Sequence, residues 1–316
     1  MYRFENENEN SKVSEALERN VCKSCLNAYS KSFSDWESHD YCNSCRKKFE
    51  VELDLRIQAN LELRSKNSSK GDNPKTFQNK SGVEFIKIPK GKNIIGANAE
   101  LKKGKKSEEK IPLASERPAH WVEMKKDFYM SIYPITFKQF SEVTGRKFSN
   151  LMKLQNYPVT GINFYEAENF IKELNLLEAT CPTTAYRLPT EAEWEYSARA
   201  NSYARYYWGN DMDSQFVWFQ ENSSGYPQRC GRKKKNSFGL YDMIGNVWEW
   251  CSDWYDENYY SASPNENPSG PKGGIFKVAR GGSFLDSEVD LRITARKHFL
   301  PESKMDNLGF RLVKMV

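Results

Sequence analysis

Four of the seven cysteines stand in two close pairs near the N-terminus. Two residues separate the members of each pair, and sixteen residues separate the pairs. Two such pairs can supply four thiolates to one tetrahedral zinc ion, as in zinc ribbons, whereas the alternative is four unrelated buried cysteines. The predicted zinc ligands are Cys22, Cys25, Cys42 and Cys45. A ribbon of this size folds only with its metal, so we expect its first role to be structural.

Residues 236–255, NSFGLYDMIGNVWEWCSDWY, combine six aromatic side chains with several polar ones. Rings at this density predict the centre of a hydrophobic core, because each ring buries a large area. Asp242 and Glu249 stand among the rings, and polar groups in such a place need hydrogen-bond partners or a metal. We therefore expect the main domain to be organised around this block.

Glu191, Glu193 and Glu195 could act as acids or bases, but their position favours a structural role. Thr190 precedes them, and Glu193 follows it by three residues, which is the pattern of a capping box at a helix N-terminus. The other two carboxylates favour the first turn of a helix through its dipole. We therefore predict a helix that begins after Thr190.

Composition and spacing divide the chain into four parts. Residues 1–20 are polar and are expected to be flexible, and residues 21–63 hold the ribbon with a following strand or helix. Residues 64–80 are rich in Ser, Asn, Lys and Gly and are predicted to be a linker. Residues 81–316 then form the main domain.

Short strands and helices are predicted to follow one another in the main domain. Alternating apolar residues predict strands near 83–89 and 117–124, and 3.6-residue spacing predicts a helix over 164–176. Thr136 is predicted to cap another helix. The sharpest basic run, GRKKKN at 231–236, is typical of a solvated loop, and the alternative is a loop that contacts phosphates.

The overall composition favours a globular protein with an unusual core. Hydrophobic residues make up 38% of the chain and the mean hydropathy is −0.79, while aromatic residues reach 14%. We expect a core of rings and loops with few long aliphatic elements. The net charge of +5 permits an acidic or nucleic-acid partner without requiring one.

The sequence gives no reason to expect a membrane partner. No run approaches the roughly 20 apolar residues that span a bilayer. The first ten residues are acidic and polar, without the apolar stretch of a secretory signal. An odd number of cysteines, four of them in metal-type pairs, argues for a reducing compartment, and we predict a cytoplasmic location.

Four blocks of the main domain carry a family resemblance: YRLPTEAEWEYSARA (186–200), the block at 236–255, VARGGSF (278–284) and NLGFRLV (307–313). In this order they resemble the formylglycine-generating-enzyme family, also called the sulfatase-modifying-factor domain. Weaker matches extend the resemblance to residues 83–316. It implies an α+β, C-type-lectin-like fold with much irregular structure, here preceded by a small zinc ribbon.

Enzymes of this family oxidise a substrate cysteine to formylglycine, with two cysteines that bind copper(I) after the GGS block. At the corresponding positions this chain has Asp286 and, in a shorter segment, Asp290, and no cysteine follows Cys251. Carboxylates are hard ligands and poor substitutes for thiolates at copper(I). The resemblance therefore implies no copper and no formylglycine-generating activity here.

Other relatives in the family use other cofactors or none. Sulfoxide synthases take iron from a histidine-rich domain, which a chain with only His39, His120 and His298 cannot build. A third group is non-catalytic and displays a binding face. It includes the target proteins of diversity-generating retroelements, which we keep as a minority interpretation.

The family also binds calcium, and the corresponding ligands here are Asp242, Glu249 and the carbonyl oxygens of Gly245 and Val247. Two carboxylates and two carbonyls suit the preference of calcium for oxygen donors. The alternative is that both carboxylates accept hydrogen bonds from backbone amides without a metal.

Segment 284–306 corresponds to the face that binding members of the family use. Its mixture of charged and aromatic side chains is typical of a protein-binding patch, and also of any surface. The predicted ligand-binding residues are Asp286, Glu288, Asp290, Arg292, His298 and Phe299. Three arginines are instead predicted to be buried and paired with carboxylates such as Asp253 or Glu249: Arg280, Arg296 and Arg311.

These observations leave three functions open. The first is a non-catalytic binding module that recognises a protein or peptide, with the ribbon as an accessory contact. The second is an oxidoreductase with a metal other than copper at Asp286 and Asp290. The third is an accessory protein that binds nucleic acid through the ribbon and lysine-rich loops. The sequence predicts no oligomeric state.

Overall fold

The protein is described by a computed structural model, in which residues 76–97, 114–149, 151–178 and 185–315 are described. The chain divides into two units after residue 72, and all of these residues belong to the second unit. The predicted ribbon, with Cys22, Cys25, Cys42 and Cys45, lies outside the described residues.

The first sheet brings the two ends of the main domain together. It has five antiparallel strands in the order β1 (Thr76–Gln78), β2 (Glu84–Ile88), β5 (Phe128–Ser131), β11 (Val313–Met315) and β6 (Tyr186–Arg187). The C-terminal strand β11 lies between β5 and β6. The predicted strand near 83–89 is confirmed as β2, in which Phe85, Ile86 and Ile88 are buried.

The second sheet is built on the aromatic block. Its four strands run in the order β10 (Leu308–Gly309), β7 (Trp248–Trp254), β8 (Lys277–Arg280) and β9 (Arg296–Phe299). Strand β10 is parallel to β7 and the other neighbours are antiparallel. Trp248, Trp250 and Cys251 of β7 are buried, as the density of rings predicts. A two-stranded sheet pairs β3 (Gly91–Ile95) with β4 (His120–Met124).

The three longer helices all begin with a capping box, which the sequence predicts for the helix after Thr190. They are α4 (Phe137–Thr144), α6 (Phe164–Leu177) and α7 (Glu191–Arg199). Thr136, Asn163 and Thr190 are their N-caps, and each forms a capping box with the residue three positions on. The short helices are α5 (Leu151–Leu154), α8 (Tyr259–Ala262), η2 (Ala114–Glu116) and η4 (Glu288–Leu291).

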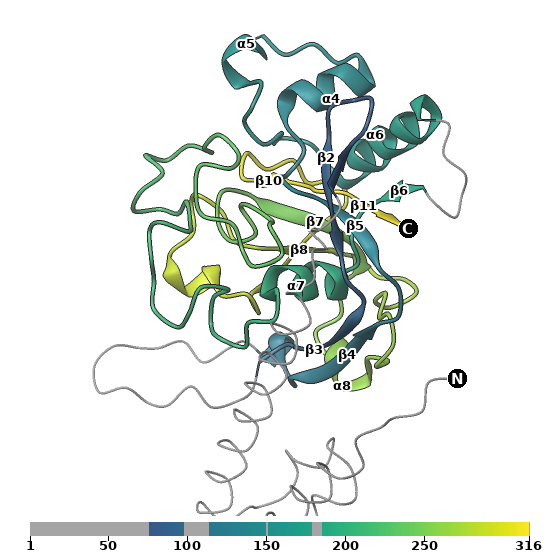
Figure 1. The fold of residues 1–316 in the computed structure, drawn as a ribbon, viewed down its shortest axis with the longest axis vertical. Coiled ribbons are helices and arrows are strands. Elements are labelled where there is room, and N and C mark those ends of the chain that lie inside the picture. The colour runs from purple at the N-terminus through teal and green to yellow at the C-terminus, as the bar shows by residue number, and fades with distance from the viewer. Residues whose placement is uncertain (1–75, 98–113, 150, 179–184, 316) are drawn as a thin grey trace, which may run out of the picture. The chain divides into compact units, whose positions relative to one another are not determined.

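Two hydrophobic clusters fill the domain. One packs the apolar face of α6 with α4, Trp250 and Phe310, and the other packs α7 with strands of the first sheet and residues of the loop before β7. Figure 1 shows α4 and α6 at one end of the domain and β3, β4 and α8 at the other. Long loops connect α7 to β7, which confirms a mixed fold with much irregular structure. Within the described residues, no helix has the length and apolarity that crossing a bilayer requires.

Candidate functional site

A polar cluster lies at one end of the second sheet, where residues from all four strands come together. Trp248 begins β7, Ser283 follows β8, Lys297 lies in β9 and Asn307 precedes β10. The strand register places these positions at the same end, because Trp248 pairs with the first residue of β10 and the last residue of β8 pairs with the first residue of β9. Their side chains gather around Asp286.

The carboxylate of Asp286 is the centre of this cluster. Trp248 Nε1 donates a hydrogen bond of 2.7 Å to Oδ2, the Ser283 hydroxyl donates to the same oxygen, and Lys297 Nζ lies 3.4 Å from Oδ1. Asn307 Nδ2 donates to Ser283 Oγ at 3.0 Å. Both oxygens of Asp286 are therefore engaged, as a buried carboxylate requires.

The turn that positions Ser283 depends on the two glycines before it. Gly281 and Gly282 have φ angles of 104° and 75°, which favour glycine. A Cβ on Gly282 would lie 2.6 Å from Cδ2 of Leu291. The Gly-Gly-Ser sequence therefore fixes both the path of the chain and the place of the hydroxyl group.

The cluster has the residue types of an acid–base site but not the access. The Ser283 hydroxyl and the Trp248 indole are buried, and Asp286 is only 9% exposed. Lys297 is the member that reaches solvent, with 43% of its side chain exposed. A substrate would have to displace these side chains to reach the hydroxyl or the carboxylate. In this arrangement the carboxylate holds the segment after Ser283 in place.

The structure does not gather the six predicted ligand-binding residues on one exposed face. Arg292 is buried, and its guanidinium donates to the buried Glu116 at 3.0 and 2.8 Å. Asp286 is likewise inside the cluster described above. Both residues were expected at the surface as part of segment 284–306. They are buried instead, because each binds a buried partner that is far away in the sequence.

The other four predicted residues lie at or near the surface, in different surroundings. Glu288 accepts a hydrogen bond of 3.2 Å from Tyr206, and Asp290 lies half-buried in the same turn, η4. His298 is exposed and stacks on Tyr255 with a centroid distance of 4.1 Å. Burial and the charge of Arg296 lower the pKa of His298. Phe299 is half-buried, edge-on to Trp250.

The two carboxylates of the predicted calcium set have protein partners. Glu249 accepts from Arg311 Nε and Nη2 at 2.6 and 2.8 Å and from Trp194 Nε1 at 2.7 Å. Asp242 accepts from the backbone N–H of Gly231 at 2.7 Å, and burial raises its pKa to about 6. An ion at this place would share Glu249 with Arg311. Calcium binding therefore stays a prediction, with the amide-bound alternative observed for Asp242.

No group of three or more His, Cys, Asp or Glu side chains is arranged to hold a metal ion in the part of the chain that the structure describes. The predicted calcium set has two carboxylates and two carbonyls, so this finding does not test it. The four cysteines of the predicted ribbon lie outside the described residues, so the finding does not apply to them.

A network of buried ion pairs is the feature that sequence reasoning only half anticipated. Arg280 and Arg296 are buried, as predicted, but they pair with Glu195 and Glu191 of α7. Arg199 of the same helix also binds Glu195, at 2.7 Å. The signal was present in the spacing, because positions 191, 195 and 199 recur every four residues and share one face of a helix.

The remaining structural predictions for charged residues hold. Glu193 forms the capping box with Thr190 and binds Arg187 at 2.6 Å. Arg311 is fully buried and pairs with Glu249, as predicted. These carboxylates are therefore structural groups rather than free acids or bases.

Comparison with known proteins agrees with this fold. Residues 70–316 match the family described as the sulfatase-modifying factor enzyme 1-like domain. The formylglycine-generating enzyme of Streptomyces coelicolor is 35% identical over 188 residues, which are 54% of this chain and 54% of that enzyme. The chain therefore spans about half the length of this relative.

Two solved structures share the fold at low sequence identity. PvdO from Pseudomonas aeruginosa has a TM-score of 0.66 and 22% identity, over 78% of this chain and 100% of that chain. Treponema denticola variable protein 1 has a TM-score of 0.66 and 23% identity over the same shares. These likenesses show the fold alone. The family match covers most of the chain, and the protein therefore belongs to the sulfatase-modifying factor enzyme 1-like family.

Proposed function

We propose that this protein is a non-catalytic binding module of the family, which recognises a protein or peptide partner through segment 284–306. The observation that carries the proposal is the closed hydrogen-bond network around Asp286. This residue stands where the enzymes of the family have their first copper-binding cysteine, and here its oxygens accept from Trp248, Ser283 and Lys297. A carboxylate held in this way supports the chain instead of reacting.

The chemistry of the donor set supports the same conclusion. Copper(I) prefers thiolates, and no cysteine follows Cys251 in the chain. Among the described residues, no group of three or more His, Cys, Asp or Glu side chains is arranged to hold a metal at Asp286 and Asp290, so no observation favours a metal there. The zinc ribbon enters the proposal as an accessory contact.

The exposed part of segment 284–306 has the composition of a binding surface. Three large apolar side chains are exposed there: Leu285 at 51%, Leu300 at 46% and Met305 at 41%. The half-exposed Lys297 and the exposed His298 add polar groups to the same segment. Apolar anchors with a polar rim are typical of protein interfaces. Because Asp286 and Arg292 hold the segment from inside, its surface is ordered before a partner arrives.

The test is a pull-down of the tagged full-length protein from its own host's lysate, with and without nuclease, followed by identification of the retained proteins. A protein partner that survives nuclease treatment is the expected result. The affinity of that partner is then measured for Leu300→Ser with Met305→Ser. Burial of a Leu or Met is worth about 1.5–3 kcal/mol when it is complete, so the loss should be roughly tenfold or more.

The matched control is Leu176→Ser with Met152→Ser. These side chains are 67% and 88% exposed and lie on α6 and α5, so the control removes the same groups outside the segment. Equal affinities of the two double variants would refute the assignment of the surface. Retention of nucleic acid alone would move the function to the ribbon and the basic loops.

A further inference from the structure

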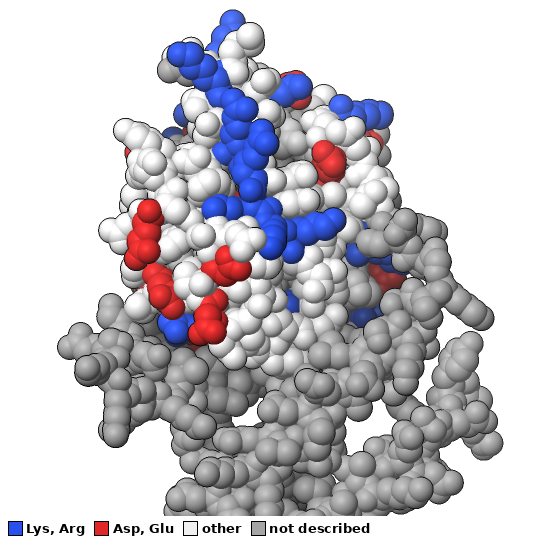
Figure 2. All heavy atoms as spheres, turned by 60° about the vertical axis from the view of Figure 1, so that its left-hand side comes forward, with Lys and Arg blue, Asp and Glu red and all other residues white. Residues whose placement is uncertain are grey.

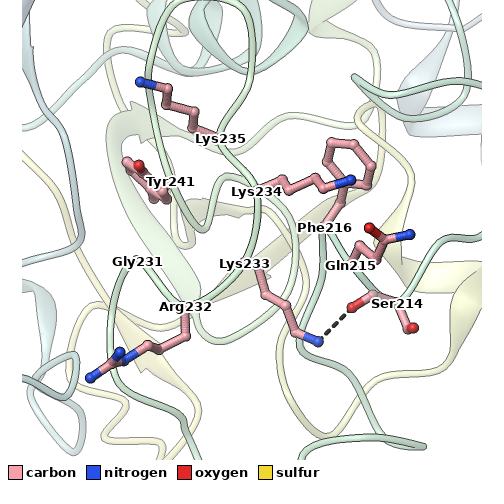
Figure 3. A pocket seen from close by; sticks show the side chains of 9 residues that line it. All are labelled: Ser214, Gln215, Phe216, Gly231, Arg232, Lys233, Lys234, Lys235 and Tyr241. Carbon is pink, nitrogen blue, oxygen red and sulfur yellow. Dashed lines mark hydrogen bonds between the residues drawn. The ribbon is translucent and has the colours of Figure 1, made fainter.

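A second surface, which no residue of segment 284–306 lines, is an open cleft of about 840 Å³. One wall is the basic loop 231–235 and the other is the segment 214–216. The residues that line the cleft are Ser214, Gln215, Phe216, Gly231, Arg232, Lys233, Lys234, Lys235 and Tyr241 (Figure 3). None of these residues is acidic, and four of them are consecutive cations that line the same cleft.

The cations of this loop are largely available to a ligand. Arg232, Lys234 and Lys235 are exposed, whereas Lys233 is half-buried and donates to the carbonyl oxygen of Ser214. None of the four makes an ion pair with a carboxylate elsewhere in the described residues. Figure 2 shows a continuous band of Lys and Arg side chains on this side of the domain. Like charges this close repel one another, and an anionic ligand would relieve that repulsion.

Hydrogen bonds hold the backbone of the loop in place, although most of its cationic side chains are exposed to solvent. The backbone N–H of Gly231 donates to the buried Asp242 at 2.7 Å. The N–H of Lys234 donates to the Gln215 carbonyl at 2.9 Å, and the Lys234 carbonyl accepts from the Tyr207 hydroxyl at 2.9 Å. A loop fixed in this way loses little conformational entropy when a ligand binds.

The aromatic residues beside the loop decide which kind of anion fits. Lys233 Nζ lies 3.7 Å from the centre of the Trp218 ring, and Lys234 Nζ lies 5.1 Å from that of Phe216. Phe216 also stacks on Trp208, with centroids 5.1 Å apart. These rings already have cationic or aromatic neighbours, so they support the lysines rather than offering open platforms for bases. Proteins that bind single-stranded nucleic acid depend on such open platforms.

The volume of the cleft is sufficient for a peptide ligand. A space of about 840 Å³ accommodates a drug-sized molecule or a short stretch of extended chain. Carboxylate or phosphate groups along a peptide could meet the cations inside.

We propose that this cleft binds an acidic segment of a peptide chain, with carboxylate or phosphate side chains. This inference rests on the proposed function, because it names the chemistry that a second part of the partner would carry. Arg232 supplies a planar fork for bidentate contacts, and the lysines supply point charges. The interaction is electrostatic and should weaken as ionic strength rises.

The experiment measures the fluorescence anisotropy of short labelled peptides with the full-length protein. One peptide carries consecutive glutamates, a second carries phosphoserines and a third carries glutamines as the neutral reference. A single-stranded oligonucleotide and a duplex of similar length are measured in parallel. We expect the two acidic peptides to bind, the neutral one not to bind, and the oligonucleotides to bind more weakly than either acidic peptide.

The variant that tests the site is Arg232→Gln with Lys235→Gln, because both side chains are exposed. It should weaken binding of the acidic peptides by roughly fivefold. The matched control is Lys172→Gln with Lys272→Gln, which removes the same two charges from exposed positions elsewhere and should leave the affinity unchanged. Equal losses in both variants would mean attraction to net charge alone and would overturn the site. Tighter binding of an oligonucleotide, lost in the cleft variant, would overturn the choice of ligand.

The outcomes for this cleft and for segment 284–306 can be separated. Leu300→Ser with Met305→Ser should not affect the acidic peptides, since its two changes lie outside the lining of the cleft. Acidic peptides that fail to bind the wild-type protein would refute the cleft proposal even when a lysate partner depends on segment 284–306. A partner that depends on the cleft variant alone would refute the proposed function while leaving the cleft assigned.

Discussion

Replacement of Arg292 by Ala should destabilise the fold strongly, although the sequence places this residue in a candidate surface patch. The Arg292 side chain is 5% exposed and its partner Glu116 is fully buried. The guanidinium donates two hydrogen bonds to that carboxylate and a third, of 2.8 Å, to the carbonyl oxygen of Val289. Alanine would remove both guanidinium hydrogen bonds from this buried carboxylate, which also accepts from the hydroxyl of Thr294.

The magnitude follows from the charge that is left behind. Removal of one partner from a buried ion pair costs about 3–5 kcal/mol, which is a large part of the 5–15 kcal/mol by which domains are stable. For a domain of this size about 1 kcal/mol lowers the melting temperature by roughly 2–4 °C, so we expect a decrease of about 6 °C at least. Glu116→Leu with Arg292→Met, which removes both charges, should be less destabilising than Arg292→Ala alone.

The assay is thermal and urea unfolding followed by circular dichroism, with Arg232→Ala as the control. Arg232 is exposed, and its replacement should change the free energy of unfolding by no more than about 0.5 kcal/mol. Equal stabilities of Arg292→Ala and Arg232→Ala would refute the reasoning, because they would mean that Glu116 does not need its partner.

Three further outcomes are expected. Burial raises the pKa of the Asp253 carboxyl to about 7, so the folded protein binds its proton more tightly than the unfolded chain does. The stability that this proton contributes is present at low pH and is lost as the pH rises to about 7. Asp253→Asn should therefore stabilise the protein more at about pH 8 than at about pH 4, and a pH-independent difference in melting temperature would contradict this. Elemental analysis should find one zinc per chain, lost in Cys22→Ser with Cys45→Ser, and undiminished zinc would rule out the predicted ribbon. Calcium should raise the melting temperature of the wild type but not of Asp242→Ala, whereas an identical response would remove Asp242 from the predicted set.

Helix starts and buried helix faces could be predicted from the sequence, because they depend on residues that are close together in the chain. Capping at Thr136 and Thr190 depends on residues three positions apart, and the buried face of α6 depends on its 3.6-residue spacing. The sheet order could not be predicted in the same way. Strand β11 lies between β5 and β6, and this arrangement depends on pairing between residues far apart in the chain.

The candidate site shows the same division between local and distant information. The family resemblance placed Asp286 at the position of a copper-binding cysteine, but two of its partners come from other strands of the sheet, Trp248 in β7 and Lys297 in β9. Arg292 is 176 residues from Glu116, and nothing in the local pattern distinguishes it from an exposed arginine. By contrast, Arg311 and Glu249 belong to two recognisable blocks, and Glu249 was one of the two carboxylates predicted to pair with the buried arginines.

Both proposed binding surfaces use a buried carboxylate to hold an exposed segment of irregular chain. Asp286 holds the start of segment 284–306 through Trp248, and Asp242 holds the start of the basic loop through the N–H of Gly231. Irregular segments lose conformational entropy on binding unless they are ordered beforehand. A fold with much irregular structure can therefore display specific surfaces if its buried acids fix the loops. In the two proposals made above, Asp286 and Asp242 therefore have the same role, which is to keep a binding surface in shape.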